Sequence, residues 1–119
     1  IKIHRCVAIA DGFYEWKREE KVKTPYYFLR EDKKNMYMAG IYENDEFCLI
    51  TENASENINI IHNRQPVILN EADVNRYLNL ELSGSNFLNE CKKTKLSFYE
   101  VSKEVNKPTN NSISLIQQI

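Results

Sequence analysis

The chain has 119 residues, of which 42% are hydrophobic, and its formal net charge is −1. This size and composition are typical of a folded protein with a modest core, so we expect residues 1–119 to form one domain. The sequence contains neither an apolar run long enough to span a bilayer nor a charged leader followed by an apolar stretch, which argues against membrane and secreted proteins.

Five segments in the first half of the chain have the composition and spacing of β-strands. They are residues 6–10, 13–17, 26–30, 36–42 and 47–51, and short polar loops such as 31–35 and 43–46 separate them. Loops of this length between strands are typical of hairpins. We therefore predict an antiparallel meander.

The second half mixes helices and strands. Asn53, followed by Glu56 three residues later, is typical of a capping box and predicts a helix that ends near His62. Pro66 forbids helix and begins an extended segment up to residue 69. Asn70 is a second candidate N-cap, for a helix with Val74, Tyr77 and Leu78 on one face. A short third helix is expected around Phe87, Leu88 and Cys91, before closing strands at 96–102 and 113–116.

Together these elements predict an α+β fold, with an antiparallel, curved or barrel-like sheet and two to three short helices. Charge is distributed unevenly over this fold. Residues 1–40 carry nine Lys/Arg and six Asp/Glu, residues 41–90 carry two and nine, and residues 91–119 carry five and two. The two basic ends would form a basic surface if they met in space. The alternative is a set of scattered, solvated faces.

The three cysteines, Cys6, Cys48 and Cys91, do not have the spacing of metal ligands, and their odd number argues against a disulfide framework. Cys6 and Cys48 fall in apolar, strand-like runs, where cysteine serves as a small core residue. We therefore expect a reducing compartment and neither a metal nor another cofactor.

The densest motif lies at residues 11–17, where the carboxylate of Glu15 stands among three aromatic residues directly after an apolar run. A carboxyl group in apolar surroundings loses hydration, which favours its neutral form and allows it to give and take protons near neutral pH. Glu15 is therefore the first catalytic candidate.

The alternative for this motif is purely structural. The Asp-Gly pair at 11–12 is a strong signal for a two-residue hairpin turn, and Glu15 would then point outward from the second strand. Strand alternation places Phe13 and Glu15 on one face and Tyr14 and Trp16 on the other.

A second motif lies at residues 60–69 and places His62 and Arg64 at a helix-to-strand junction. The planar fork of arginine suits a phosphate, and histidine can transfer a proton near neutral pH. A lone histidine at a helix end is more often a cap or a packed residue, so this reading stays open for His62.

Taken in order, the following motifs extend over nearly the whole chain: Arg5-Cys6, Ala10-Asp11-Gly12-Phe13-Tyr14-Glu15-Trp16, Thr24-Pro25-Tyr26-Tyr27, Ala39-Gly40-Ile41-Tyr42-Glu43, Leu49-Ile50-Thr51, Ile61-His62-Asn63-Arg64 and Pro66-Val67-Ile68-Leu69. They resemble the SOS response-associated peptidase (SRAP) family, and residues 101–116 resemble its closing segment.

The resemblance implies a protein of the SOS and DNA damage responses that processes abasic sites in single-stranded DNA. In this family an N-terminal cysteine, exposed when the initiator Met is removed, condenses with the ring-opened sugar aldehyde and closes to a thiazolidine, which is a DNA–protein crosslink. An amine and a thiol on one residue can form a Schiff base and trap it at high effective concentration.

The resemblance also assigns roles on this chain. Glu15 matches the family's active-site glutamate and would transfer protons during amine attack and sugar ring opening. His62 matches the active-site histidine and would assist Schiff-base formation and the reverse, lyase-type release. Trp16 and Thr51 match positions that line the DNA cleft, and Arg64 would hold a backbone phosphate.

Three departures limit these assignments. Asn63 stands where the family usually has Asp, and Gln65 where it often has Met. The family's N-terminal portion, with the nucleophilic cysteine and an active-site asparagine, has no counterpart here, and Cys6 matches an internal strand position instead. We therefore expect a single SRAP-like domain that lacks its N-terminal segment and is inactive alone.

The expected partner is single-stranded DNA with an abasic site, bound by a monomer in the bacterial cytoplasm, associated with the nucleoid, or in a eukaryotic nucleus. Three alternatives remain: a non-catalytic module that binds single strands, a thiol autopeptidase that removes its own leading residue, and an inactive, truncated relative. Salt-sensitive binding without dependence on an abasic site would indicate the first of these.

Overall fold

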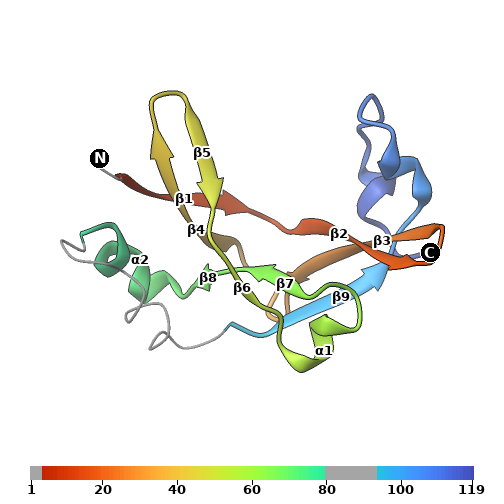
Figure 1. Cartoon of the computed structure of the whole chain (residues 1–119), viewed down its shortest axis with the longest axis horizontal. Coiled ribbons are helices and arrows are strands. Elements are labelled where there is room, and N and C mark those ends of the chain that lie inside the picture. The colour runs from red at the N-terminus through yellow and green to blue at the C-terminus, as the bar shows by residue number, and fades with distance from the viewer. Residues whose placement is uncertain (1–3, 80–93) are drawn as a thin grey trace.

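The computed structural model describes residues 4–79 and 94–119 (Figure 1). The elements in these ranges are β1 (His4–Ala10), β2 (Phe13–Glu19), β3 (Val22–Arg30), β4 (Met36–Glu43), β5 (Glu46–Leu49), β6 (Thr51–Asn53), α1 (Glu56–Asn59), β7 (Arg64–Pro66), β8 (Ile68–Leu69), α2 (Glu71–Leu78), β9 (Leu96–Glu100) and the 3-10 helices η1 (Lys103–Asn106) and η2 (Ile113–Ile116).

The strands form two sheets and a ribbon, and every pairing is antiparallel. One sheet has the order β1-β4-β5, with β8 also paired to β4, and the other has the order β2-β3-β9. Strands β6 and β7 form the ribbon between them (Figure 1). The predicted α+β fold with antiparallel sheets is confirmed. Over the described residues the sheets do not close into a barrel.

The predicted meander and the hairpin at residues 11–12 are wrong, although the predicted hairpin loop at 43–46 is present between β4 and β5. Strand β1 pairs with β4, and β2 pairs with β3, so the Asp-Gly pair carries the chain from one sheet to the other. Gly12 crosses very close to β3, because a Cβ atom built on it would lie 2.5 Å from the Tyr27 hydroxyl oxygen and closer still to the carbonyl oxygen of Phe28. A residue without a Cβ atom is therefore needed where the chain passes β3 on its way from β1 to β2.

The single strand predicted at 47–51 is two strands, β5 and β6, which belong to different sheets. Ile50 separates them. Its N–H donates to the carbonyl of Ala39 and its own carbonyl accepts from the N–H of Val67, each at 2.9 Å. These bonds draw the chain away from β4 and towards the β6–β7 ribbon.

The first helix begins later than predicted, because Asn53 is used elsewhere. Asn53 lies in β6 opposite Arg64, and its side-chain oxygen accepts a hydrogen bond from Arg64 Nη1 at 2.7 Å. Helix α1 therefore starts after Ser55. The second predicted N-cap is confirmed, because Asn70 directly precedes α2 in an extended conformation.

Of the two strands predicted in the closing segment, one is present and the other is not. The strand at 96–102 is present as β9, whereas 113–116 is the 3-10 helix η2 instead of a strand. Tyrosine side chains take the place of a neighbouring strand: the Tyr14 hydroxyl donates to the carbonyl of Leu115 at 3.2 Å, and the Tyr99 hydroxyl donates to that of Ile116. The helix predicted around Phe87, Leu88 and Cys91 lies outside the described residues.

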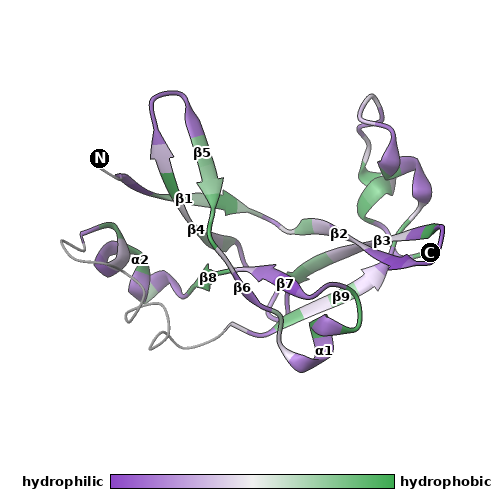
Figure 2. Cartoon of the chain, in the orientation of Figure 1, coloured by the Kyte–Doolittle hydropathy of each residue, from purple (hydrophilic) through white to green (hydrophobic). Residues whose placement is uncertain are grey.

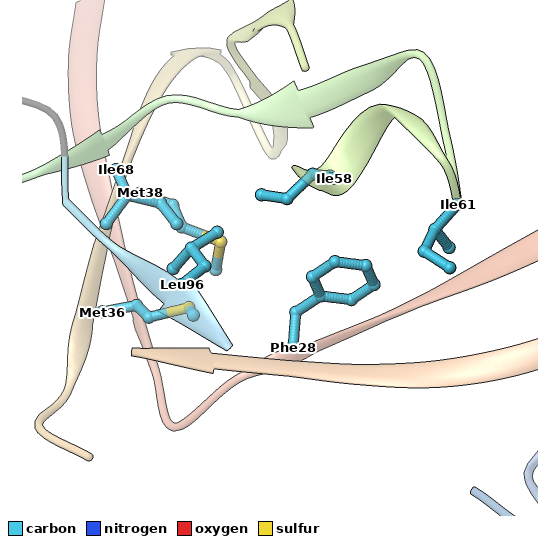
Figure 3. Packing of buried hydrophobic residues seen from close by; sticks show 7 residues of the cluster. All are labelled: Phe28, Met36, Met38, Ile58, Ile61, Ile68 and Leu96. Atoms are coloured by element: carbon cyan, nitrogen blue, oxygen red, sulfur yellow. The ribbon is translucent and has the colours of Figure 1, made fainter. Parts of the chain in front are cut away.

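The main core joins the two sheets to α1. Its buried members are Phe28, Met36, Met38, Ile58, Ile61, Ile68 and Leu96. Ile61, just after α1, points towards the ring of Phe28, which is fully buried, and Ile58 points from α1 into the same cluster (Figure 3). Burying a side chain of this size stabilises a fold by about 1.5–3 kcal/mol. This contact fixes the end of α1 against the β2–β3 pair.

A second cluster packs α2 on the sheet that contains β4. Its buried members are Ala39, Val67, Leu69 and Tyr77. The Tyr77 hydroxyl donates to the carbonyl of Gly40 at 2.7 Å, so the polar end of this buried ring is satisfied.

The loop that joins β4 and β5 is hydrophilic, as is most of β7 (Figure 2).

Candidate functional site

Strand β2 presents Glu15 on the core side of the sheet. Phe13, two residues earlier on the same face, stacks on Phe28 with the ring centroids 4.9 Å apart and the planes within 7°. Alternation then directs Glu15 to the same side, where its side chain is 28% exposed. The predicted division of the strand into two faces holds here.

His62 is placed by the end of α1. Its N–H donates to the carbonyl of Ile58 at 3.1 Å, and its neighbour Ile61 is buried in the main core. On the imidazole ring, Nδ1 lies 3.2 Å from the backbone nitrogen of Arg64 and 3.1 Å from its carbonyl oxygen. The backbone of Arg64 therefore accommodates Nδ1 either as an acceptor or as a donor.

These two placements bring Glu15 and His62 together. The distance from His62 Nε2 to Glu15 Oε1 is 3.7 Å, and the same carboxylate oxygen accepts a hydrogen bond from the N–H of Trp16 at 3.2 Å. The approach is longer than a hydrogen bond, and both side chains are about one-third exposed, so the pair is open to solvent and to a ligand.

The arrangement suits an imidazolium that faces a carboxylate. When both ring nitrogens of His62 carry protons, Nδ1–H can donate to the carbonyl of Arg64 while Nε2–H points to Glu15. When only Nε2 is protonated, Nδ1 accepts from the Arg64 N–H and the Nε2–H still faces the carboxylate. The imidazole ring of His62 can therefore keep the same orientation in both protonation states.

Arg64 and Thr51, two predicted DNA contacts, lie together on the β6–β7 ribbon. Arg64 donates from Nε to Thr51 Oγ1 at 3.3 Å, and from Nη2 to Thr51 Oγ1 and to the Thr51 carbonyl at 3.1 and 2.9 Å. With the bond from Nη1 to Asn53, all three guanidinium nitrogens brace the ribbon. The side chain is exposed, and one N–H of Nη1 makes no hydrogen bond to the described residues.

Trp16, the third predicted contact, lies on the opposite face of β2. Its indole Nε1–H donates to the side-chain oxygen of Asn106 at 2.6 Å. Burial raises the pKa of the neighbouring Tyr14, and Tyr99 raises it further, so that the phenol that holds Leu115 keeps its proton. The structure thus places Trp16 apart from the ribbon and next to the C-terminal segment.

Two residues of this region could not be recognised from the sequence. Gln65 accepts from the N–H of Ser55 at 3.0 Å and donates to Glu52 at 3.1 Å, so it ties β6, β7 and the start of α1 together. Asn106 fixes the Trp16 ring. Both contacts join segments distant in sequence, and only the register of β6 with β7 points to the first.

Over residues 4–79 and 94–119 there is no group of three or more His, Cys, Asp or Glu side chains that could hold a metal ion. No helix in the part of the chain that the structure describes is long and apolar enough to cross a membrane. The expectation that Cys6 and Cys48 are core residues is wrong: Cys6, in β1 opposite Gly40, is only partly buried, and Cys48 is exposed in β5, because neither side chain points into one of the two buried clusters.

Comparisons with known proteins agree on one family. The model of the SOS response associated peptidase (SRAP) family matches residues 1–108. The chain is 29% identical to abasic site processing protein YMR114C of Saccharomyces cerevisiae over 97% of its own length. It is 27% identical to abasic site processing protein YedK of Escherichia coli over 97% of its length. It is 33% identical to abasic site processing protein YoqW of Bacillus subtilis over 95% of its length. It covers 35%, 58% and 57% of these relatives, respectively.

Solved structures show the same fold. A protein from Bacteroides thetaiotaomicron matches with a TM-score of 0.82 and 26% identity, over 98% of this chain and 57% of that one. A protein from Bordetella bronchiseptica, at 22% identity, matches with a TM-score of 0.68 over 83% of this chain and 55% of that one, and supports the fold alone. The chain thus spans about half the length of the E. coli and B. subtilis relatives and of these two solved structures.

Proposed function

The chain belongs to the SOS response-associated peptidase family, and we propose that it processes abasic sites in single-stranded DNA, with Glu15 and His62 as the groups that move protons. The observation that carries this proposal is the 3.7 Å approach between His62 Nε2 and Glu15 Oε1. The names of the relatives support the substrate class.

The proposed reaction begins with an amine that attacks the aldehyde of a ring-opened abasic sugar. The nitrogen bonds to the aldehyde carbon and loses a proton, while the carbonyl oxygen gains one. The resulting carbinolamine loses water to give an imine, and a thiol on the same residue adds to the imine carbon as its proton passes to nitrogen. By resemblance to the family, both groups would come from an N-terminal cysteine in a full-length form of the protein.

Glu15 and His62 fit the two proton transfers of this scheme. The Glu15 carboxylate accepts the proton that the attacking amine loses, and the Nε2–H of a His62 imidazolium donates to the hydroxyl that leaves as water. The Arg64 carbonyl, 3.1 Å from Nδ1, stabilises the protonated ring before it donates the proton from Nε2. General acid–base catalysis of this kind is worth about 10²–10⁴-fold in rate.

The strand is held, in this proposal, by Trp16, Thr51 and Arg64. An aromatic ring beside cations grips single strands without reading their sequence. The one N–H of Arg64 Nη1 that is free of the ribbon's bonds would donate to a backbone phosphate, and Thr51 presents Arg64 for that contact.

The test is a denaturing gel of the full-length protein incubated with single-stranded DNA that carries an abasic site. The proposal predicts a retained covalent species that forms more slowly with Glu15→Gln. It predicts no crosslink for residues 1–119 alone, because Cys6 is internal to β1. If the full-length protein retains no DNA, the proposal is wrong.

A second candidate is a module that binds single strands without catalysis. The exposed ribbon that presents Arg64, and the ring of Trp16 held by Asn106, favour it as well. It predicts equal affinity for intact and abasic strands, with binding that weakens steeply as salt is added. Equal affinities together with no covalent species would select this candidate.

A further inference from the structure

The loop between β6 and β7 carries His62 and depends on few anchors. It runs from residue 54 to residue 63, and the N–H of Ala54 donates to the carbonyl of Asn63 at 3.0 Å, which closes its two ends. Helix α1 within this loop is a single turn of four residues, a length that is not stable alone. The position of His62 therefore depends on what holds the start of this turn.

Gln65 holds the start of the turn from the neighbouring strand. It lies in β7 opposite Glu52, and its amide bonds in two directions: Oε1 accepts from the N–H of Ser55 at 3.0 Å, and Nε2 donates to Glu52 Oε2 at 3.1 Å. Ser55 directly precedes α1, and its own hydroxyl bonds to Asn57 at 2.8 Å without capping the helix. The acceptor for the backbone at this helix start thus comes from a side chain three residues beyond His62.

Backbone hydrogen bonds connect this anchor to the imidazole. The carbonyl of Ser55 accepts from the N–H of Ile58 at 3.0 Å, and the carbonyl of Ile58 accepts from the N–H of His62 at 3.1 Å. From the other side, the backbone nitrogen of Arg64, the residue before Gln65, lies 3.2 Å from His62 Nδ1. Gln65 therefore restrains the segment that presents His62 at both of its ends.

We propose that Gln65 is a positioning residue, whose amide keeps His62 Nε2 at its 3.7 Å approach to Glu15 Oε1 during the paired proton transfers. The inference rests on the proposed function. The role is indirect, because Gln65 bonds to Ser55 and Glu52 and acts on His62 through the backbone. Small displacements of catalytic groups lower rates strongly, so even a slight loosening of this loop should be measurable.

The usual motif of the family does not supply this link. The family often has Met where this chain has Gln65, and a thioether does not donate and accepts only weakly. Gln65→Met therefore removes both bonds with little change in volume. Gln65→Glu combined with Glu52→Gln exchanges the two side chains, so that a carboxylate at position 65 can accept from the Ser55 N–H and from an amide at position 52.

Nuclear magnetic resonance of the 119-residue chain tests the link itself. The chain has two histidines, and His4, whose ring stacks on Tyr42 at 5.0 Å, is the internal reference. A hydrogen bond of ordinary net strength shifts a two-state population by about fivefold. Gln65→Met should therefore lower the order parameter of the His62 ring and speed exchange of the Arg64 amide by about fivefold, with the His4 ring unchanged. The double variant should restore both values.

Capture of abasic single-stranded DNA by the full-length protein tests the consequence. Gln65→Met should slow the rate at saturating DNA by about fivefold and leave the DNA concentration at half-saturation unchanged. The double variant should capture at the wild-type rate. Gln118→Met makes the same chemical change at an exposed position and should alter neither the rate nor the His62 ring. Circular dichroism checks that each variant folds, and Gln65→Asn, whose shorter side chain cannot span both bonds, replaces Gln65→Met if that variant does not.

The outcomes separate this role from the proposed function. Disorder of the His62 ring in Gln65→Met that the double variant reverses would retain the link, and if the wild type then formed no covalent species, the reaction alone would be rejected. Unchanged His62 order in Gln65→Met, or a capture rate equal to that of the wild type, would overturn the positioning role and leave the reaction standing. Slow capture that the folded double variant does not restore would overturn it as well.

Discussion

Gly12 is the position at which one added methyl group should do the most damage. Its Cβ would lie 2.5 Å from both Cζ and the hydroxyl oxygen of Tyr27, and nearer still to the carbonyl oxygen of Phe28. No real Cβ contact is that short, so something must move. The neighbours resist, because the Phe28 oxygen belongs to the backbone and Tyr27 is only 6% exposed, between Tyr14 and Tyr99.

The size of the effect follows from two opposing contributions. Overpacking of a well-filled site costs about 1–3 kcal/mol, and this site belongs at the upper end because neither neighbour is flexible. Replacing glycine by alanine restricts the unfolded chain, and this alone raises the free energy of unfolding by about 0.4–1 kcal/mol. The net loss for Gly12→Ala should be about 2 kcal/mol, or a fall of about 8 °C in Tm. Gly12 does not have a positive φ, so this loss is steric.

Urea unfolding followed by Trp16 fluorescence measures this loss, since the probe lies in the strand that Gly12 introduces. Gly40→Ala is the matched control. Its Cβ would meet the Cys48 carbonyl oxygen at 3.0 Å and Cys6 Sγ at 3.1 Å, so a small shift suffices and the cost should stay below about 1 kcal/mol. The reasoning fails if Gly12→Ala costs less than Gly40→Ala.

Three further predictions concern pH, the ribbon and the start of α1. Burial raises the pKa of Tyr27, with a smaller contribution from Asp11, and burial also raises the pKa of Tyr77. Their contribution to stability is therefore complete below pH ~10 and is lost as the pH rises above it. The free energy of unfolding, measured with urea, should then fall less between neutral and alkaline pH in Tyr77→Phe than in the wild type. Arg64→Lys should weaken the β6–β7 ribbon by about 1 kcal/mol, seen as faster amide exchange there and not in β3. Gln65→Met leaves the N–H of Ser55 unpaired and should cost about 1 kcal/mol in urea unfolding, whereas a cost near zero would show that the amide bridge is unimportant.

The sequence predicts local geometry well on β2. Alternation places Phe13 and Glu15 on one face, where the structure finds them against Phe28 and His62, and it places Trp16 on the other. Such patterns succeed because side-chain direction along a strand follows from backbone geometry alone. The roles of these residues stay predictions.

Strand pairing is where the sequence prediction fails. An Asp-Gly pair is compatible with a hairpin, but its use as a crossing between sheets depends on how closely Gly12 approaches β3, a contact that no local pattern encodes. Asn53 illustrates a second limit. Its amide can cap a helix or accept from Arg64, and the pairing of β6 with β7 decides for the arginine.

Candidate site residues divide in the same way. Glu15 and His62 could be proposed because two dense motifs contain them, and the core contact of Ile61 with Phe28 explains why they converge. The structural roles of Gln65 and Asn106 could not be proposed, because these side chains act through hydrogen bonds to residues distant in sequence, two for Gln65 and one for Asn106.

The most direct test of the paired proton transfer is a double-mutant cycle on abasic single-stranded DNA. Rates of covalent capture by the full-length protein would be measured for the wild type, Glu15→Gln, His62→Gln and the double variant. A pair that acts as a unit predicts that each single change slows capture by about 10²-fold and that the double variant is no slower than the worse single variant. Losses that multiply to about 10⁴-fold in the double variant would show two independent groups and contradict the pairing.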